Sequence, residues 1–303
     1  MSLSVAPGGT AVAQGQLSLG ADSCLAVQTL TNEHESEVLE FLAVRPVHTV
    51  FMAGFIRDNG LVSPLNRGTF YACRDPKGRL EGVALIGHAT LVEARTEGAL
   101  AAFARLSQDC PSAYLILGEQ ENVERFWSHY SETGCTPRLV GRELLFERRW
   151  PVPQDDQVQG LRPANIYHVA EVLPVNAEMA FEESGVNPMD ADPMGFLSRT
   201  IRRIEQGRVW VWIENGRLIF KADVMADTPG VVYLEGVYVD REERRKGYGQ
   251  RCFSQLCRSL LVPGRSVCLL VNEENRDARA FYERAGCKLV GHYGTIFLNG
   301  TGG

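Results

Sequence analysis

The sequence predicts an α+β protein built from two consecutive halves. Apolar stretches with the spacing of β-strands alternate with stretches whose apolar residues recur every three or four positions, as in amphipathic helices. Two prolines and two acids interrupt this pattern over 150–156, before a new start at Leu161. We interpret the interruption as a linker. We therefore expect a disordered tail over residues 1–23, a first domain over 24–150 and a second domain over 151–303.

In the second domain, the apolar pattern predicts a regular succession of elements. Asn215-Gly216 between two apolar runs is a strong signal for a β-hairpin. The expected elements are helices at 165–181 and 193–206, strands at 208–213, 217–225 and 231–239, a helix at 252–261, a strand at 266–271, a helix at 276–285, and closing strands through Leu289 and Phe297.

The first domain repeats this order faintly. Gly78-Arg79-Leu80, in one predicted hairpin, mirrors Gly216-Arg217-Leu218 in the other, 138 positions further on. The expected elements are helices at 32–42 and 47–58, strands at 68–73 and 83–86, an apolar strand after them, a helix at 97–106, a strand at 113–117, a helix at 121–130 and a strand at 143–147. A duplicated fold is the simplest explanation, and chance similarity of two short hairpins is the alternative.

The bulk composition excludes some classes of partner. The 303 residues are 45% hydrophobic and 22% charged, with a formal net charge of −6 and no basic stripe of the kind that binds nucleic acid. No apolar run approaches the roughly 20 residues of a membrane-spanning helix, and residues 1–23 lack the features of a signal peptide. We expect no nucleic-acid or membrane partner, and a monomer or homodimer.

The cysteines and histidines give no sign of a metal site. Eight cysteines are scattered without Cys-x-x-Cys pairs, and none of the six histidines has metal-ligand spacing with them. Reduced core thiols are therefore the expected state. We predict a cytoplasmic protein without a metal cofactor.

The segment 244–250 (Arg-Arg-Lys-Gly-Tyr-Gly-Gln) has the composition of a phosphate-binding loop. It follows the predicted strand 231–239 and precedes a predicted helix. Its two glycines, Gly247 and Gly249, allow a tight turn that aims several N–H groups at one point, and the helix N-terminus adds partial positive charge. Three cationic side chains lie beside them. This combination favours a diphosphate ligand.

Spacing distinguishes the possible diphosphate ligands. The loop has only the first two glycines of G-x-G-x-x-G, and it lacks the Gly-Lys-Ser/Thr of a P-loop. Arg244, Gly247 and Gly249 do fit [Arg/Gln]-x-x-Gly-x-[Gly/Ala]. With its flanks, this pattern resembles the acetyl-CoA loop of the GNAT N-acetyltransferase superfamily. The flanks are 234–240, which look like the central strand of that family, and 275–287, which look like its Asn-x-x-Ala-x-x-x-Tyr-x-x-x-Gly-Phe segment.

The resemblance covers about residues 160 to 300 and departs from the family pattern at one position. Cys287 stands where the family has Phe, so we expect local repacking there.

The whole chain, including the segment Arg45-Pro-Val-His48, looks like a bacterial tandem-GNAT group with a degenerate N-terminal copy. Two tandem domains, each a twisted mixed β-sheet flanked by helices, are thereby implied. Residues 92–100, where the first copy would need its loop, hold one glycine, one arginine and two acids, which would repel a diphosphate. We therefore expect the N-terminal copy to have a structural or substrate-shaping role.

The resemblance implies an acetyl-CoA-dependent N-acetyltransferase. The acetyl group would pass directly to a primary amine of a small molecule or peptide, in a ternary complex and without a metal. One alternative is a non-catalytic acyl-CoA-binding regulatory or sensor protein. Another keeps the catalysis but changes the acceptor to an amino-acid conjugate or a small thiol precursor. The sequence does not choose among acceptors.

Residue roles follow from the same resemblance. The implied cofactor-binding residues are Val237, Tyr238, Val239, Arg244, Arg245, Lys246, Gly247, Tyr248, Gly249, Gln250, Asn275, Ala278, Phe281 and Tyr282. Val237 to Val239 would pair with the pantetheine arm as an added strand does, and the loop N–H groups would bind the pyrophosphate.

Tyr282 and Glu235 have expected catalytic roles, and Glu182 and Glu183 are candidates for binding substrate. Tyr282 is the candidate acid for the departing thiolate, because its ordinary pKa of about 10 keeps it protonated; simple helix packing is the alternative. Glu235 is the candidate base, unless it merely faces solvent or pairs with an arginine. Glu182 and Glu183 could attract a cationic amine, or could be an ordinary solvated helix end.

Overall fold

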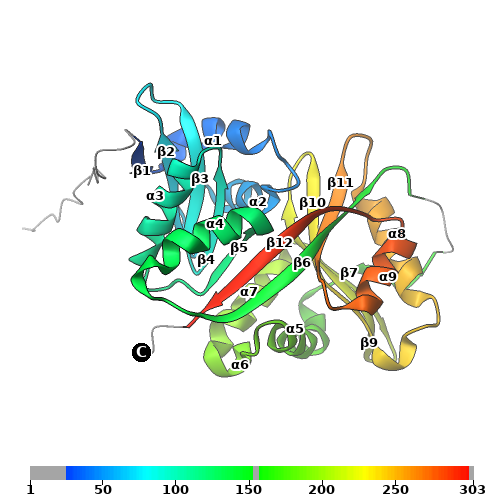
Figure 1. The fold of residues 1–303 in the computed structure, drawn as a ribbon. Coiled ribbons are helices and arrows are strands. Elements are labelled where there is room, and N and C mark those ends of the chain that lie inside the picture. Colours follow the sequence, from blue (N-terminus) through cyan, green and yellow to red (C-terminus); the bar gives the residue numbers. More distant parts are fainter. Residues whose placement is uncertain (1–24, 153–156, 300–303) are drawn as a thin grey trace, which may run out of the picture.

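A computed structural model describes residues 25–152 and 157–299. The expected tail and the central part of the expected linker lie outside these residues. The described strands form one continuous twelve-stranded sheet in the order β1-β2-β3-β4-β5-β12-β6-β11-β10-β9-β8-β7 (Figure 1). The mixed α+β prediction is confirmed. None of the helices in the described ranges is long and apolar enough to cross a membrane.

The first half supplies the elements at one end of this sheet. They are β1 (Ala26–Thr29), α1 (Glu35–Leu42), α2 (Val50–Asn59), β2 (Gly68–Arg74), β3 (Leu80–Gly87), β4 (Ala89–Ala94), α3 (Glu97–Gln108), β5 (Leu115–Glu119), α4 (Gln120–Tyr130) and β6 (Pro137–Arg149). Helices α3 and α4 pack over a cluster that includes the fully buried Phe103 and Phe126. Helices α1 and α2 supply another cluster, around Leu42 and Phe70.

The second half repeats the same order of elements. They are β7 (Arg162–Pro163), α5 (Val169–Ser184), α6 (Pro188–Ala191), α7 (Pro193–Glu205), β8 (Val209–Glu214), β9 (Arg217–Asp227), β10 (Val231–Val239), α8 (Tyr248–Leu260), β11 (Ser266–Asn272), α9 (Arg276–Arg284) and β12 (Lys288–Leu298). The predicted hairpin is confirmed: Asn215 and Gly216 both have positive φ, 50° and 76°, as a two-residue hairpin turn requires. Helix α8 begins at Tyr248, four residues before its predicted start, and the expected closing strands are the single strand β12.

The two halves exchange their last strands. Strand β6 ends the first half but pairs with β11 of the second, from Glu143 opposite Asn272 to Arg149 opposite Ser266. Strand β12 ends the second half but pairs with β5 of the first. The two exchanged strands also pair with each other and cross the middle of the molecule side by side (Figure 1). Each half therefore completes its part of the sheet with a strand from the other.

Helix α2 of the first half packs against the second half. Gly54 lets it approach β9 so closely that an added Cβ would lie 2.5 Å from the Cβ of Ala226. Arg208 holds the C-terminal end of the helix through ion pairs to Asp58. A cluster shared by both halves includes Val50 of α2 and Tyr233 of β10. The first half thus buttresses the sheet of the second.

Candidate acyl-transfer site

Strands β10 and β11 part after three paired residues. They are parallel and pair from Val231 opposite Ser266 to Tyr233 opposite Cys268. Beyond this point β10 continues to Val239 and β11 to Asn272, with no pairing recorded between them in the described chain. The backbone of β10 over Leu234–Val239 therefore has an open edge that can accept an extended ligand as an added strand.

The loop after β10 ends at a helix N-terminus without a side-chain cap. A 3₁₀ turn, Arg241–Glu243, leads into it, and Arg245 and Gly247 adopt left-handed φ values of 65° and 83°. Gly247 occupies the N-cap position of α8 and has no side chain to bond the first N–H groups of the helix. Within the described ranges, no acceptor is recorded for the backbone N–H groups of residues 245–250. These donors and the helix dipole form an anion-binding concavity.

The second glycine of the loop has a packing role. Gly249 is buried, and an added Cβ would lie 2.9 Å from Val239 Cγ2 and 3.1 Å from Phe281 Cε2. The next residue, Gln250, donates a hydrogen bond of 2.7 Å from Nε2 to the Phe281 carbonyl. The prediction that both glycines make the turn is thus corrected: Gly247 turns the chain, whereas Gly249 lets α8 lie directly against β10 and α9.

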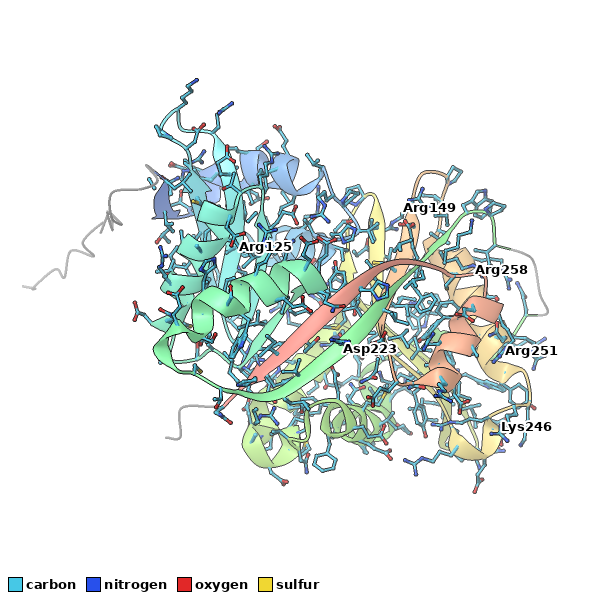
Figure 2. The ribbon with its side chains drawn as sticks, viewed as in Figure 1. Arg125, Arg149, Asp223, Lys246, Arg251 and Arg258 are labelled. Atoms are coloured by element: carbon cyan, nitrogen blue, oxygen red, sulfur yellow. The ribbon has the colours of Figure 1, made fainter. Side chains whose placement is uncertain are left out.

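The cationic side chains of the loop differ in whether they already have a bonding partner. Lys246 Nζ lies 2.9 Å from Glu243 Oε2, and Arg244 donates from Nε to the Val239 carbonyl at 3.0 Å. No side-chain partner is recorded for the exposed Arg245 among the described residues. Lys246 and Arg251 lie at the outer edge of the second half, far from the central Asp223 (Figure 2). Arg245 is therefore the cation most available to an incoming anion.

Helix α9 carries the second predicted segment. Asn275 caps the helix by accepting a hydrogen bond of 3.0 Å from the Ala278 N–H group. Tyr282 is 8% exposed and packs with Phe253 and Phe281, at ring-centroid distances of 5.4 and 5.0 Å. Burial raises the pKa of its phenol well above the ordinary value, so the phenol is protonated at neutral pH. It shares one apolar cluster with residues of the two parting strands.

Carboxylates from three elements lie within electrostatic range of one another. They are Glu143 on β6, Glu183 at the end of α5 and Glu235 on β10. Burial, reinforced by the negative charges of Glu235 and Glu143, raises the pKa of Glu183 to about 8. Burial also raises the pKa of Glu143, against a hydrogen bond of 2.6 Å from Thr295 Oγ1 that lowers it.

Glu183 and Glu235 combine two properties that are usually separate. Both side chains are exposed to solvent, yet burial is the largest effect that raises the pKa of each. The negative charges of Glu235 and Glu143 add to the effect at Glu183. We call Glu143, Glu183 and Glu235 the acidic cluster. Glu182 lies apart from it, because its carboxylate is 3.5 Å from Arg241 and largely exposed.

Comparison with known protein families finds a match within the second half. The model of the acetyltransferase (GNAT) family matches residues 177–287, which include the loop, the parting strands and Tyr282. The second half thus matches a GNAT domain, and we refer to it by that name. No curated protein matches the sequence.

Solved structures share the fold over nearly the whole chain. A tandem GNAT protein from the clavulanic acid biosynthesis pathway is 13% identical, with a TM-score of 0.56, covering 92% of this chain and 99% of its own. A GCN5-related N-acetyltransferase from Sphaerobacter thermophilus is 15% identical, with a TM-score of 0.55 and coverages of 90% and 95%. A GNAT-family acetyltransferase from Colwellia psychrerythraea is 9% identical, with a TM-score of 0.55 and coverages of 90% and 99%. At these identities the likeness establishes the tandem GNAT fold alone.

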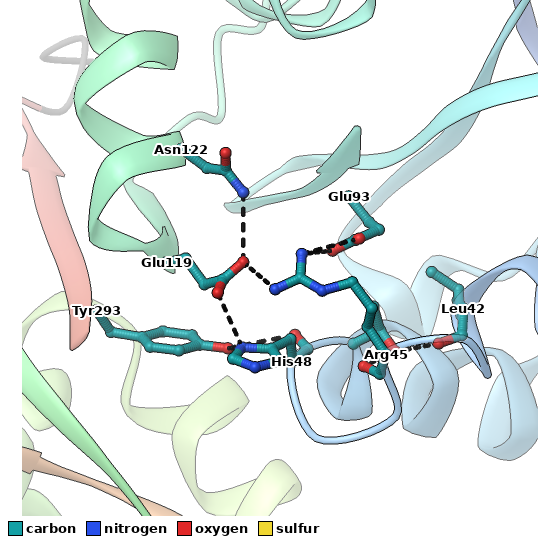
Figure 3. A network of polar contacts seen from close by, with 8 residues as sticks. Leu42, Arg45, His48, Glu93, Glu119, Asn122 and Tyr293 are labelled. Atoms are coloured by element: carbon teal, nitrogen blue, oxygen red, sulfur yellow. Dashed lines mark hydrogen bonds and ion pairs between the residues drawn. The ribbon is translucent and has the colours of Figure 1, made fainter. Parts of the chain in front are cut away.

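Two parallel strands of the first half also separate, but charged side chains of the first half lie just beyond their last pair. Strands β4 and β5 pair only from Ala89 opposite Leu115 to Leu91 opposite Leu117. Just beyond, the guanidinium of Arg45 bridges Glu93 on β4 and Glu119 at the end of β5 (Figure 3).

A residue of the second half also contacts this ion-pair network of the first half. His48 Nδ1 lies 3.3 Å from Glu119 and 3.1 Å from the hydroxyl of Tyr293 on β12. A small cavity remains beside these groups, walled by Phe51, Met52 and Leu117. An ion-pair network therefore stands in the first half where the GNAT domain of the second half has an open strand edge.

Two features of the GNAT domain were missed by sequence reasoning. Glu143 comes from the first half and joins the acidic cluster only through the strand exchange. Lys221 is buried beside Glu235, and the one sequence signal for it was a lysine between apolar residues of a strand, with Asp223 two positions on and so on the same face. In the described ranges, no group of histidines, cysteines and acids could hold a metal ion.

Proposed function

We propose that the chain transfers an acetyl group from acetyl-CoA to a primary amine, in a ternary complex formed by the GNAT domain. One observation carries the proposal: the open edge of β10 over Leu234–Val239 leads directly to the uncapped N-terminus of α8. The first feature suits an extended amide-containing arm and the second suits a diphosphate. Coenzyme A has both parts, joined in that order. The coenzyme supplies the acetyl group as an activated thioester.

The residues that would hold the coenzyme follow from their positions. The N–H groups of residues 245–250 and the guanidinium of Arg245 would bind the pyrophosphate. The backbone of Val237, Tyr238 and Val239 would pair with the amides of the arm. Asn275 contributes indirectly, since it caps α9 and so fixes the start of the helix that carries Tyr282.

The acidic cluster supports a cationic amine as the acceptor. An ammonium ion beside it would relieve the repulsion that raises the pKa of Glu183. Attack on a thioester requires the neutral amine, so a base must then remove one proton. We assign this step to Glu235, which lies on the parting strand itself and whose charge raises the pKa of Glu183. Tyr282 would protonate the departing thiolate, because its raised pKa keeps the phenol protonated at neutral pH.

A transfer assay with a panel of amines tests the proposal. Acetyl-CoA is incubated with the protein and a diamine, an amino sugar, an amino-acid ester or a short peptide, and release of thiol is followed together with acetylation of the amine. We expect transfer to at least one of the cationic amines. Binding of acetyl-CoA without transfer to any amine would favour the acyl-CoA sensor instead.

A matched pair of variants tests where the coenzyme binds. Arg245→Ala removes the cation without a recorded partner, and should weaken acetyl-CoA binding about tenfold. Arg125→Ala removes an arginine of similar type that pairs with Glu97 on the first half, and should leave binding unchanged. Equal effects in both variants would place the coenzyme elsewhere.

The location of the protein belongs to the same proposal. Buried free thiols such as those of Cys257 and Cys268 suit a reducing compartment, so we propose a cytoplasmic location. Fractionation of cells that express the tagged chain would test it.

A further inference from the structure

Lys221 is a fully buried lysine in the middle of the GNAT-domain sheet. It is 1% exposed and lies on β9 between the buried Phe220 and Ala222. Removing an ammonium ion from water is costly unless it is paired, so lysine is rarely buried to this extent. A buried cation next to a candidate active site therefore calls for a specific partner.

Its partners form a chain that ends on the backbone of β10. Lys221 Nζ donates to the Gly236 carbonyl at 3.0 Å and forms an ion pair of 3.0 Å with Asp223 Oδ1. The other oxygen of Asp223 accepts a hydrogen bond of 3.1 Å from Arg203 on α7. Asp223 is itself buried, and its Oδ2 would lie 3.5 Å from a Cβ added at Gly236, so both members of the ion pair lie close to this glycine. The order is thus Arg203, Asp223, Lys221 and the Gly236 carbonyl.

The carbonyl that Lys221 binds belongs to a β-bulge. On β10, Glu235 lies opposite Asp223 and Tyr238 lies opposite Lys221, so Gly236 and Val237 share one partner residue on β9. Gly236 adopts a φ of 60°, and an added Cβ would lie 2.6 Å from Lys221 Nζ. Glycine is therefore needed both for the conformation and for the closeness of the ammonium group. Bulges re-aim the groups that follow them.

The bulge lies where the position of the backbone matters most for the proposed reaction. It begins two residues after the last pair between β10 and β11, and it sets the direction of the open edge at Val237–Val239. It also carries Glu235, whose carboxylate is close enough to Lys221 for the ammonium to favour its ionised form. One buried cation thus contacts the bulge and acts on the candidate base.

We propose that Lys221 is a positioning residue of the GNAT domain: its ammonium group holds the Gly236 carbonyl and so fixes the bulge that presents the open edge of β10 to the acyl-thioester end of the coenzyme. This inference rests on the proposed function. A lysine that only neutralised Asp223 would contribute to stability alone.

The decisive variant is Lys221→Met, which keeps the aliphatic length and removes the charge. The double variant Lys221→Met/Asp223→Asn removes both buried charges, and so provides a folded protein if an unpaired Asp223 prevents folding of the single variant. Lys77→Met, in an exposed turn of the first half, is the matched control. Thermal unfolding and circular dichroism establish that each variant is folded.

Amide hydrogen exchange without ligand tests the positioning directly. We expect exchange in the segment 235–240 to rise at least about tenfold in the Lys221 variants, because the bulge loses its anchor, while α8 and β11 exchange as in the wild type. Unchanged protection of 235–240 in folded variants would overturn the inference. This readout does not depend on any activity, so it separates failure of the inference from failure of the proposed function.

Ligand binding and pH dependence test the consequence. Acetyl-CoA should bind about tenfold more weakly to the variants, whereas adenosine 3′,5′-bisphosphate, which lacks the pantetheine arm, should bind as to the wild type. In Lys221→Met the acid limb of the kcat/KM profile should move to higher pH, because Glu235 loses a neighbouring positive charge. The double variant also loses the negative charge of Asp223, which acts on Glu235 in the opposite direction, so it serves the binding and exchange tests only. Equal weakening for both ligands, or an unshifted limb in Lys221→Met, would contradict a positioning role. If the wild type binds neither ligand, the proposed function fails, and the exchange result alone decides the role of Lys221.

Discussion

Phe51 of the first half packs on Tyr233 of the second, with ring centroids 4.2 Å apart and planes tilted by 51°. Tyr233 is the last residue of β10 that pairs with β11, so this contact supports the sheet at the point where the two strands part. The first half therefore stabilises the GNAT domain from the face opposite the core under α8 and α9.

Phe51→Ala should lower the free energy of unfolding by about 2–4 kcal/mol, because it leaves a cavity between the halves. Acetyl-CoA binding should weaken in parallel. Chemical denaturation and calorimetry measure the two effects. Tyr167→Ala, which truncates an aromatic that is 86% exposed, is the control and should change neither. A loss of stability without any effect on binding would show that the contact does not support the site.

Gly247 and Gly264 provide a matched test of the loop. Their φ values are 83° and 85°, and neither has an atom within 4 Å of an added Cβ. Alanine at either position should cost about 1–2 kcal/mol of stability from backbone strain. Only Gly247→Ala should also weaken acetyl-CoA binding, because it distorts the N–H groups of the loop. Titration calorimetry measures this, and equal affinities for the two variants would argue against the loop as the pyrophosphate site.

Tyr282→Phe should reduce kcat about 10- to 100-fold while the affinity for acetyl-CoA stays the same. The ring contacts with Phe253 and Phe281 survive the change, so stability should be nearly unaltered. Tyr167→Phe, which removes a largely exposed phenol, is the control for a general loss of hydroxyl groups. Unchanged turnover in Tyr282→Phe would leave Tyr282 with its packing role only.

Glu183 should make the stability of the protein depend on pH. Its pKa rises from about 4.5 to about 8 on folding, so the folded protein keeps a proton that the unfolded chain has lost between these values. Wild-type stability should therefore fall as the pH rises from about 4.5 to about 8. Glu183→Gln cannot ionise, so its Tm should exceed that of the wild type increasingly over this window. The neighbouring Glu182→Gln is the control, and a Tm difference for Glu183→Gln that is independent of pH would contradict the raised pKa of Glu183 in the acidic cluster.

The same variant tests the coupling of the two carboxylates in catalysis. Glu183 keeps its proton up to a pKa of about 8 because the charge of Glu235 is already present, so Glu183→Gln should leave the acid limb of the kcat/KM profile close to that of the wild type. Glu235→Gln should instead lower kcat about 10²- to 10⁴-fold, as expected for loss of a base. Steady-state rates over a range of pH decide both points. If both variants behave alike, Glu235 has no special role.

Local signals explain how much of the fold could be predicted. The Asn215-Gly216 turn and the order of the elements follow from short-range pattern, and both were predicted. The start of α8 was placed four residues late, because Gly247 begins the helix by its left-handed conformation and without a capping side chain. A pattern of apolar residues contains no sign of such a start.

Long-range pairing explains most of what could not be predicted. Strand β6 would show the same apolar pattern whichever strand it paired with, so its insertion between β11 and β12 is not visible in the sequence. Glu143 was missed for that reason. The ion pairs of Arg45 in the first half join elements far apart in the chain, and they too follow from the fold and not from local spacing.

Titration calorimetry of the wild-type protein with acetyl-CoA tests the central claim most directly. The open strand edge and uncapped helix occur in the second half, whereas Arg45 fills the corresponding place in the first. The account therefore predicts one acetyl-CoA bound per chain, with the binding weakened in Gly247→Ala and kept in Gly264→Ala. The absence of any heat of binding, or two equivalent sites per chain, would contradict it.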